Sequence, residues 1–149
     1  MRRQAAVVFL CLIANTLAYA ETLSAPQTRF AAVDVYLDSG DEALAAWQFE
    51  LADHDARIQV VGIESGEHPA FDEPPHYDRD AVATGKADRV AVADFSLAPA
   101  GELPKGQTRI ATVHVRIEGD APPDYHIALI AAGDTHGKPI PAQISIRKK

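Results

Sequence analysis

The amino-acid sequence predicts an all-β protein, and more specifically an antiparallel β-sandwich. Apolar and polar residues alternate with a period of two along many short segments, which is typical of strands with one buried and one exposed face. Glycine, proline and aspartate are concentrated between these segments, where they favour turns. After the first twenty residues, no segment carries the apolar spacing of a long amphipathic helix. Short strands joined by turns predict two sheets packed face to face.

The first two predicted strands, 30–38 and 44–52, show this alternation clearly. In the first, aliphatic residues share one face, whereas Asp34, Tyr36 and Asp38 share the other. In the second, the only tryptophan of the chain lies in phase with a phenylalanine and a leucine. We therefore expect the tryptophan in the core and the polar face of the first strand towards solvent.

The later predicted strands include one irregularity. Strand 58–64 shifts its apolar phase by one residue between Val60 and Val61, which predicts a β-bulge or a change of sheet. Strand 108–118 places its valines on one face and His114 on the other, so we expect a surface histidine. The remaining predicted strands are 89–96, 125–132 and 142–147.

A long segment, 65–86, interrupts the strand pattern. It combines glycines and prolines with many acidic residues and two histidines. This composition predicts a loop, with one short helical turn over 78–84. Loops of this length inside a compact domain are often functional.

The first twenty residues have the organisation of a secretory signal peptide. Two arginines follow the initiator methionine, an apolar stretch occupies 5–17, and a small-x-small cleavage site ends at Ala20. The apolar stretch is too short to span a bilayer. We therefore expect cleavage after Ala20 and a single mature domain, 21–149, that is secreted or periplasmic.

Charge and cysteine content argue against several classes of protein. Two of the 14 basic residues and none of the 21 acidic ones lie in 1–20, so cleavage would lower the formal charge from −7 to −9. Such a surface disfavours nucleic acid and anionic lipid as partners. Cys11 lies in the predicted signal peptide, so the mature chain would have no thiol. No second apolar stretch reaches the ~18 residues of a membrane helix, so we expect no membrane span after cleavage.

Several stretches of the chain together resemble a cohesin domain. The family has an "L-x-A-aromatic-Q-F-x-L" strand, then "V-x-G-V-x-x-G", and later a "G-x-L-x-x-L-x-F" strand. The resembling stretches are DVYLD (34–38), LAAWQFEL (44–51), VVGIESG (60–66), RVAVADFS (89–96) and LPKGQTRIATVHV (103–115). The similarity covers roughly 30–118 and consists mostly of core and turn positions.

The resemblance implies a jelly-roll β-sandwich of the cohesin and carbohydrate-binding-module type. Cohesins are non-catalytic and bind dockerin modules through one sheet face. This chain departs from the family at the Asp-Pro turn, which reads His54-Asp-Ala, and in the Pro-, His- and acid-rich segment 65–86. Dockerin-contacting residues vary within the family, so none is carried over to this chain.

Imidazole and carboxylate groups cluster within 65–86, where His68, Asp72, His76 and Asp78 are candidate metal ligands. Such groups bind Zn²⁺ or Ca²⁺ when they converge. The sequence has neither an HExxH nor an EF-hand pattern, and no helix would place the two histidines on one face. The alternatives are an ordered loop that binds a partner and a plain surface loop. We therefore assign no cofactor, and Zn²⁺ or Ca²⁺ stays an alternative.

Three tyrosines, Tyr36, Tyr77 and Tyr125, are candidates for contact with a partner or a sugar, because they lie off the core phase or beside loops. Trp47 could stack on a sugar, but its phase places it in the core. The sequence has no Gly-x-Ser-x-Gly motif and no phosphate-binding glycine loop. We therefore predict that the protein is not an enzyme.

These observations predict a secreted, non-catalytic binding module. We expect it to bind an extracytoplasmic protein through an exposed sheet face and the 65–86 segment. One alternative is a carbohydrate-binding module, whose ligand would be a polysaccharide. Others are a metal-dependent activity at the His68/His76 loop and a structural component of an envelope assembly.

Overall fold

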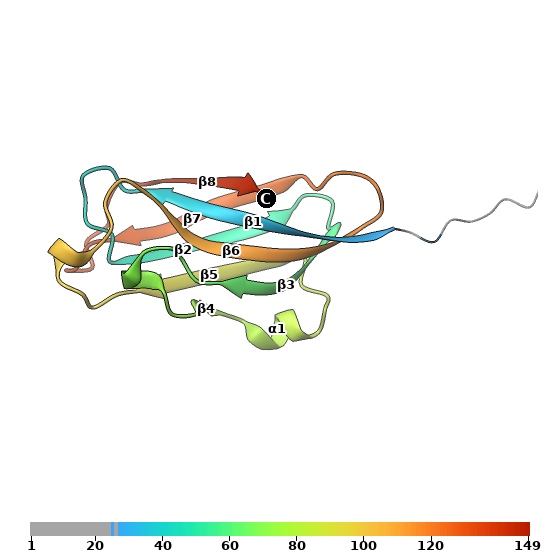
Figure 1. Ribbon diagram of the computed structural model, residues 1–149, viewed down its shortest axis with the longest axis horizontal. Helices are drawn as coiled ribbons and strands as arrows, with labels where there is room; N and C mark the ends of the chain where they lie inside the picture. Colours follow the sequence, from blue (N-terminus) through green and yellow to red (C-terminus); the bar gives the residue numbers. More distant parts are fainter. Residues whose placement is uncertain (1–24, 26) are drawn as a thin grey trace, which may run out of the picture.

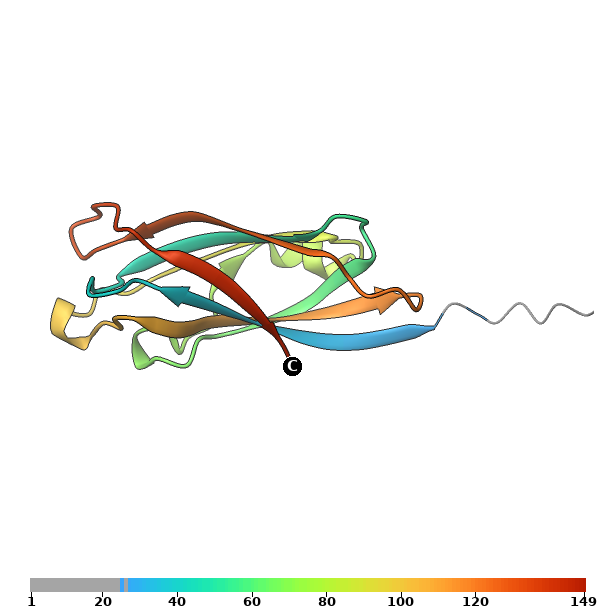
Figure 2. The same ribbon diagram turned by 90° about the horizontal axis from the view of Figure 1, so that it is seen from above.

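The computed structural model of the protein describes residue 25 and residues 27–149, which form two packed β-sheets (Figures 1 and 2). The strands are β1 (Thr28–Asp38), β2 (Ala46–Asp53), β3 (Ile58–Glu64), β4 (His76–Tyr77), β5 (Arg89–Phe95), β6 (Gln107–Glu118), β7 (Tyr125–Gly133) and β8 (Gln143–Lys148). The short helices are η1 (Pro69–Phe71), α1 (Arg79–Ala83) and η2 (Ala100–Glu102). The predicted signal peptide, with its cleavage point and Cys11, lies outside the described residues.

The connections between strands give a jelly roll. Sheet A has the strand order β3-β6-β1-β8 and sheet B has the order β4-β5-β2-β7. Every strand pair is antiparallel, and consecutive strands change sheet at each connection except that between β4 and β5. The predicted all-β antiparallel sandwich with jelly-roll topology is therefore confirmed.

The core lies between the two sheets and is built from the alternate residues that the sequence indicated. Trp47, Phe49 and Leu51 of β2 are at most 2% exposed and face the aliphatic residues of β1 and β6. The rings of Trp47 and Phe49 stack with centroids 5.7 Å apart, and Phe71 meets Trp47 edge-on at 5.9 Å. Trp47 is thus a core residue, as its phase predicts.

Bulges account for the phase changes within strands. In β3 the pairing with β6 shifts between Val60 and Gly62, which confirms the predicted bulge and turns Val61 outwards. In β6 the extra residue opposite β1 is Ile110, so that Ile110 and Ala111 are both buried. In β7 the extra residue opposite β2 is Ile130, which is 57% exposed. The bulge in β7 was not predicted, although it shapes the surface described below.

The 65–86 segment is ordered against the sandwich. Its predicted helical turn is confirmed as α1, whose N-cap is Asp78. The segment begins in close contact with β6, because a Cβ at Gly66 would lie 2.8 Å from the carbonyl oxygen of Arg109. Phe71 then enters the core. The two-residue β4 was not predicted, because so short a strand shows no alternation.

The helices of the described part are short. The longest, α1, lies at the edge of the sandwich beside β3 (Figure 1). No helix within residues 25 and 27–149 has the length and apolar character needed to cross a membrane.

Candidate partner-binding face

The outward face of sheet A is polar, and its groups bind one another. Thr112 donates a hydrogen bond to Asp34 at 2.6 Å and accepts one from Arg109 at 2.9 Å, while the Nζ of Lys149 lies 3.5 Å from the same carboxylate. Asp34 is only 7% exposed. The expectation that this face of β1 points freely into solvent is therefore wrong at Asp34, because long side chains from β6 and the C-terminus cover the carboxylate.

Other side chains on the outward face of sheet A also contact one another. The Nε2 atom of His114 lies 3.0 Å from Glu64, a carboxylate that sequence order alone did not place near this half-exposed histidine. Arg147 covers the ring of Tyr36, with its guanidinium carbon 4.1 Å from the ring centroid. Among the described residues, the large exposed apolar side chains on this face are Phe30 and Val61, which border a hollow of about 510 Å³. Most of this outward face is therefore already occupied by its own contacts.

The outward face of sheet B is different, because alanines are frequent on it, with Gln48 and Glu50 of β2 and Arg89 of β5 between them. Since the alternate residues of β2 fill the core, the intervening ones face outwards, together with their cross-strand partners on β5 and β7. Six of these outward positions are alanines: Ala46, Ala52, Ala91, Ala93, Ala128 and Ala131. Alanine is uncommon in strands, where larger β-branched side chains are preferred. The result is a flat surface on which the backbone lies close to solvent.

A hollow of about 720 Å³ lies at one end of this alanine-lined face. Phe95 and Ile130, each 57% exposed, border it, and residues 139–142 of the β7–β8 connection form a further wall. His76 of β4 stacks on Phe95 with the two rings 6.0 Å apart and 8° from parallel. Trp47 also lines the hollow, and its Nε1 has no hydrogen-bond acceptor among the described residues. The hollow thus combines exposed apolar side chains with polar groups at its edges.

One titratable group of the hollow is perturbed. Burial raises the pKa of Asp94, and two smaller effects oppose it, a hydrogen bond from the backbone N–H of Phe95 and the nearby His76. The hydrogen bond spans 2.8 Å from N to Oδ1. Asp94 is therefore a carboxylate whose charged form is disfavoured by the apolar surroundings of this end of sheet B.

The structure gives the four candidate metal ligands separate roles. His68 caps η1, its Nδ1 accepting from the N–H of Ala70 at 3.1 Å, and Asp72 ends the same helix. Asp78 caps α1, its Oδ1 accepting from the N–H of Ala81 at 2.8 Å, whereas His76 belongs to the hollow. Within the described residues no group of three or more histidine, cysteine or acidic side chains is arranged to hold a metal. Three of these side chains therefore begin or end the short helices of the 65–86 segment and do not converge on an ion.

The three candidate tyrosines are not brought together. Tyr36 lies on sheet A, whereas Tyr77 and Tyr125 belong to sheet B and pack half-buried against the core. Lys148 lies over the ring of Tyr125, with Nζ 5.4 Å from the centroid. Burial, and secondarily the charge of Asp53, raise the pKa of Tyr125, while Arg29 acts in the opposite direction.

The residues that sequence reasoning missed are Phe95, Ile130 and the alanines of sheet B. A signal for them was present, because Phe95 is out of phase with Val90 and Val92. The alanines also occupy the outward positions of several strands, where larger side chains are usual. What the sequence did not show is that β5, β2 and β7 are neighbours, since that depends on the topology.

Two solved structures share this fold. A type I cohesin–dockerin complex from Clostridium thermocellum aligns with a TM-score of 0.54 at 16% identity, covering 79% of this chain and 84% of that one. A non-cellulosomal cohesin from the archaeon Archaeoglobus fulgidus aligns with a TM-score of 0.54 at 14% identity, covering 78% and 76%. No family model and no curated protein matches the sequence. The resemblance seen in the sequence is thereby confirmed at the level of the fold, which is that of a cohesin-like jelly-roll β-sandwich.

Proposed function

We propose that the protein is a non-catalytic binding module that holds another protein through the outward face of sheet B. The observation that carries this proposal is the contrast between the two outward faces. Charged groups of sheet A pair closely with one another, whereas sheet B has one exposed, longer ion pair, Arg89 with Glu50 at 3.9 Å. Sheet B also offers six alanines and two exposed apolar side chains, Phe95 and Ile130. Protein interfaces commonly combine exposed apolar side chains with interspersed polar groups.

The shape of this face suits a protein better than a sugar. A sugar-binding surface would present several aromatic platforms in a row, but Phe95 is the only exposed phenylalanine, tyrosine or tryptophan on the outward face of sheet B. The alanines instead allow a partner to approach the backbone closely over several strands. A hollow of about 720 Å³ beside Phe95 could receive one large partner side chain.

The 65–86 segment contributes to the same face. It supplies β4, which pairs with β5 and places His76 against Phe95. The sheet face and the segment, predicted from the sequence as two recognition elements, therefore form one continuous surface in this proposal. The two cohesins that share the fold support it, because one of them is seen in complex with a dockerin.

The proposed partner lies outside the cytoplasm. This part of the proposal rests on the signal-peptide pattern of residues 1–20, and the acidic composition of 21–149 is compatible with it. An exported partner surface with exposed basic or apolar groups would complement the charge of this chain.

The proposal is tested by capture of proteins from the extracytoplasmic fraction of the source organism on the immobilised protein. We expect Ala93→Arg to reduce capture at least about tenfold, because a long charged side chain would stand on this face beside the hollow. The matched control is Ala32→Arg, which makes the same change on the outward face of sheet A. Melting temperatures of both variants verify that each is folded.

The outcomes of this experiment separate the alternatives. Equal loss of capture in Ala93→Arg and Ala32→Arg would contradict a role for sheet B. Retention on a polysaccharide panel, with no protein captured, would favour the carbohydrate-binding alternative. Loss of capture in EDTA would indicate a metal requirement. A parallel capture from the cytosolic fraction tests the location, and specific capture from that fraction alone would contradict the extracytoplasmic assignment.

A further inference from the structure

A pair of histidines lies on the outward face of sheet B, at the end opposite the hollow. His126 belongs to β7 and stands beside Ala52 of β2, while His54 follows two residues after Ala52. Their ring centroids are 5.3 Å apart and the ring planes meet at 50°. Both side chains are exposed, so an ion in solution can reach them.

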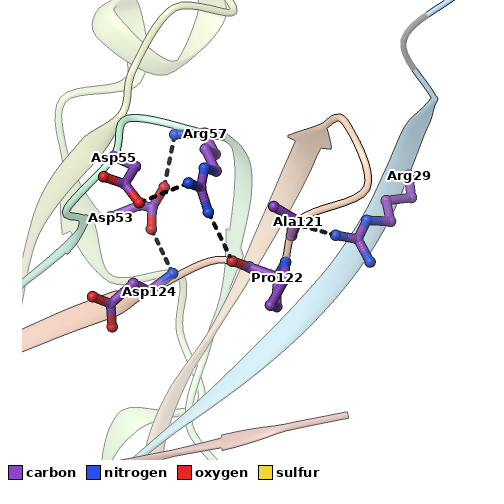
Figure 3. A network of polar contacts seen from close by, with 7 residues as sticks. All are labelled: Arg29, Asp53, Asp55, Arg57, Ala121, Pro122 and Asp124. Carbon is purple, nitrogen blue, oxygen red and sulfur yellow. Dashed lines mark hydrogen bonds and ion pairs between the residues drawn. The ribbon is translucent and has the colours of Figure 1, made fainter.

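The backbone under this pair is held by a buried carboxylate. Asp53, 7% exposed, accepts one hydrogen bond from the N–H of Arg57 and one from the N–H of Asp124, each 2.7 Å long (Figure 3). The N–H of His54 in turn donates to the carbonyl oxygen of Asp124 at 3.1 Å. The β2–β3 turn, which carries His54, is thus tied to the start of β7, which carries His126.

Arginine side chains extend this network on the far side of the turn. Arg57 pairs with Asp55 at 2.9 Å and donates to the carbonyl oxygen of Pro122 at 3.2 Å (Figure 3). Arg29 donates to the carbonyl oxygen of Ala121 at 2.6 Å. These contacts hold the β2–β3 turn and the β6–β7 connection in place. The backbone that carries the two imidazoles is therefore already positioned before any ligand binds, as a binding site requires.

The separation of the two rings matches that of a chelate. With a metal–nitrogen distance of about 2.0–2.1 Å, the ion lies roughly 3.2 Å from each ring centroid, so two rings at a right or tetrahedral angle stand about 4.5–5.2 Å apart. The observed 5.3 Å lies just above this range, and both side chains are exposed and free to rotate by the small amount that a chelate needs. No side-chain hydrogen bond or ion pair joins either imidazole to another described residue, so binding an ion would break none.

We propose that His54 and His126 together bind one divalent transition-metal ion, with water in the remaining coordination positions. Imidazole nitrogen selects Cu²⁺, Ni²⁺ or Zn²⁺ over the oxygen-seeking Ca²⁺ and Mg²⁺. Since the described residues supply no third ligand to the pair, the bound ion exchanges readily with ions in solution. This inference does not depend on the proposed function, because it concerns other residues and another ligand.

The proposal is tested by calorimetric titration of the protein, purified without a histidine tag, with ZnCl₂. We expect one ion per chain, and about tenfold or greater weakening in either His54→Ala or His126→Ala, because each variant loses the second, intramolecular ligand. The control is His136→Ala, an exposed histidine of the β7–β8 connection, which should leave the affinity unchanged.

A second measurement reports the ligands directly. Electron paramagnetic resonance of the protein with one equivalent of Cu²⁺ should show coupling to two imidazole nitrogens in the unaltered chain and to one in each variant. Unchanged spectra in both variants, or equal weakening of Zn²⁺ binding in His136→Ala, would overturn the proposal. Because His54 and His126 are exposed, their replacement should not unfold the domain, and melting temperatures verify this.

Discussion

At the residue scale, small side chains leave the backbone of sheet B close to the surface. Alanine buries little and stabilises a strand poorly, so its repeated use at outward positions favours a role other than stability. The large apolar side chains of this face, Phe95 and Ile130, are each 57% exposed and lie beside a hollow. The same surroundings affect Asp94, which also lines the hollow, because burial there raises its pKa.

Asp94→Asn tests this effect of burial on stability. A carboxyl group whose pKa is raised in the folded state binds its proton more tightly there than in the unfolded chain, so folding is favoured as the pH falls through that raised pKa. At neutral pH the unaltered protein carries this disfavoured charge, whereas the asparagine variant does not. We therefore expect Asp94→Asn to be at least as stable as the parent at pH 7.

The measurement is denaturant unfolding of both proteins at pH 7 and near pH 4. The advantage of Asp94→Asn should shrink towards acid pH, because the parent's carboxyl group becomes protonated. An advantage that grows as the pH falls would contradict the assigned direction of the shift. The amide oxygen of asparagine can still accept the hydrogen bond from Phe95 N–H, so the comparison isolates the charge.

At the element scale, alternation within strands determines which residues are buried. In β6, Val115 is fully buried between the sheets, and its neighbour His114 faces outwards, where it contacts Glu64. The long strands show this alternation over many residues, which is why their positions and faces were predictable. By contrast, β4 has two residues, and the bulge at Ile130 depends on pairing with β2.

The pair of variants Val115→Asp and His114→Ala tests the orientation of β6. Val115→Asp would bury an unpaired charge, which costs roughly 3–5 kcal/mol and should unfold much of the protein. His114→Ala removes only a half-exposed ion pair and should change the free energy of unfolding by about 0.5 kcal/mol or less. Urea titrations followed by tryptophan fluorescence measure both. Effects of similar size at the two positions would contradict the assigned faces of the strand.

The sequence predicted the fold more fully than the candidate site. Alternation, turn residues and the resemblance to cohesins together predict the sandwich, the core position of Trp47 and the bulge in β3. The face of sheet B could not be predicted, because it joins strands that are distant in sequence. Asp53 and His126 illustrate the same limit, since hydrogen bonds across the topology bring their segments together.

At the scale of the whole molecule, the sandwich presents two unlike faces to its surroundings. Sheet A carries ion pairs and hydrogen bonds among its own side chains, and sheet B carries alanines, the hollow and the histidine pair. A partner that binds sheet B would displace water from apolar surface, and the ion pair on this face, Arg89 with Glu50 at 3.9 Å, is exposed and weak. This difference between the faces is the central argument for the proposed function.

The measurement that tests this argument most directly is methyl NMR of the protein with ¹³C-labelled alanine, recorded free and with the captured partner. We expect the methyl signals of the six outward alanines of sheet B to shift on binding, while that of Ala32 on sheet A does not. Shifts centred on Ala32, with the sheet B signals unchanged, would rule out sheet B and move the binding site to the opposite face.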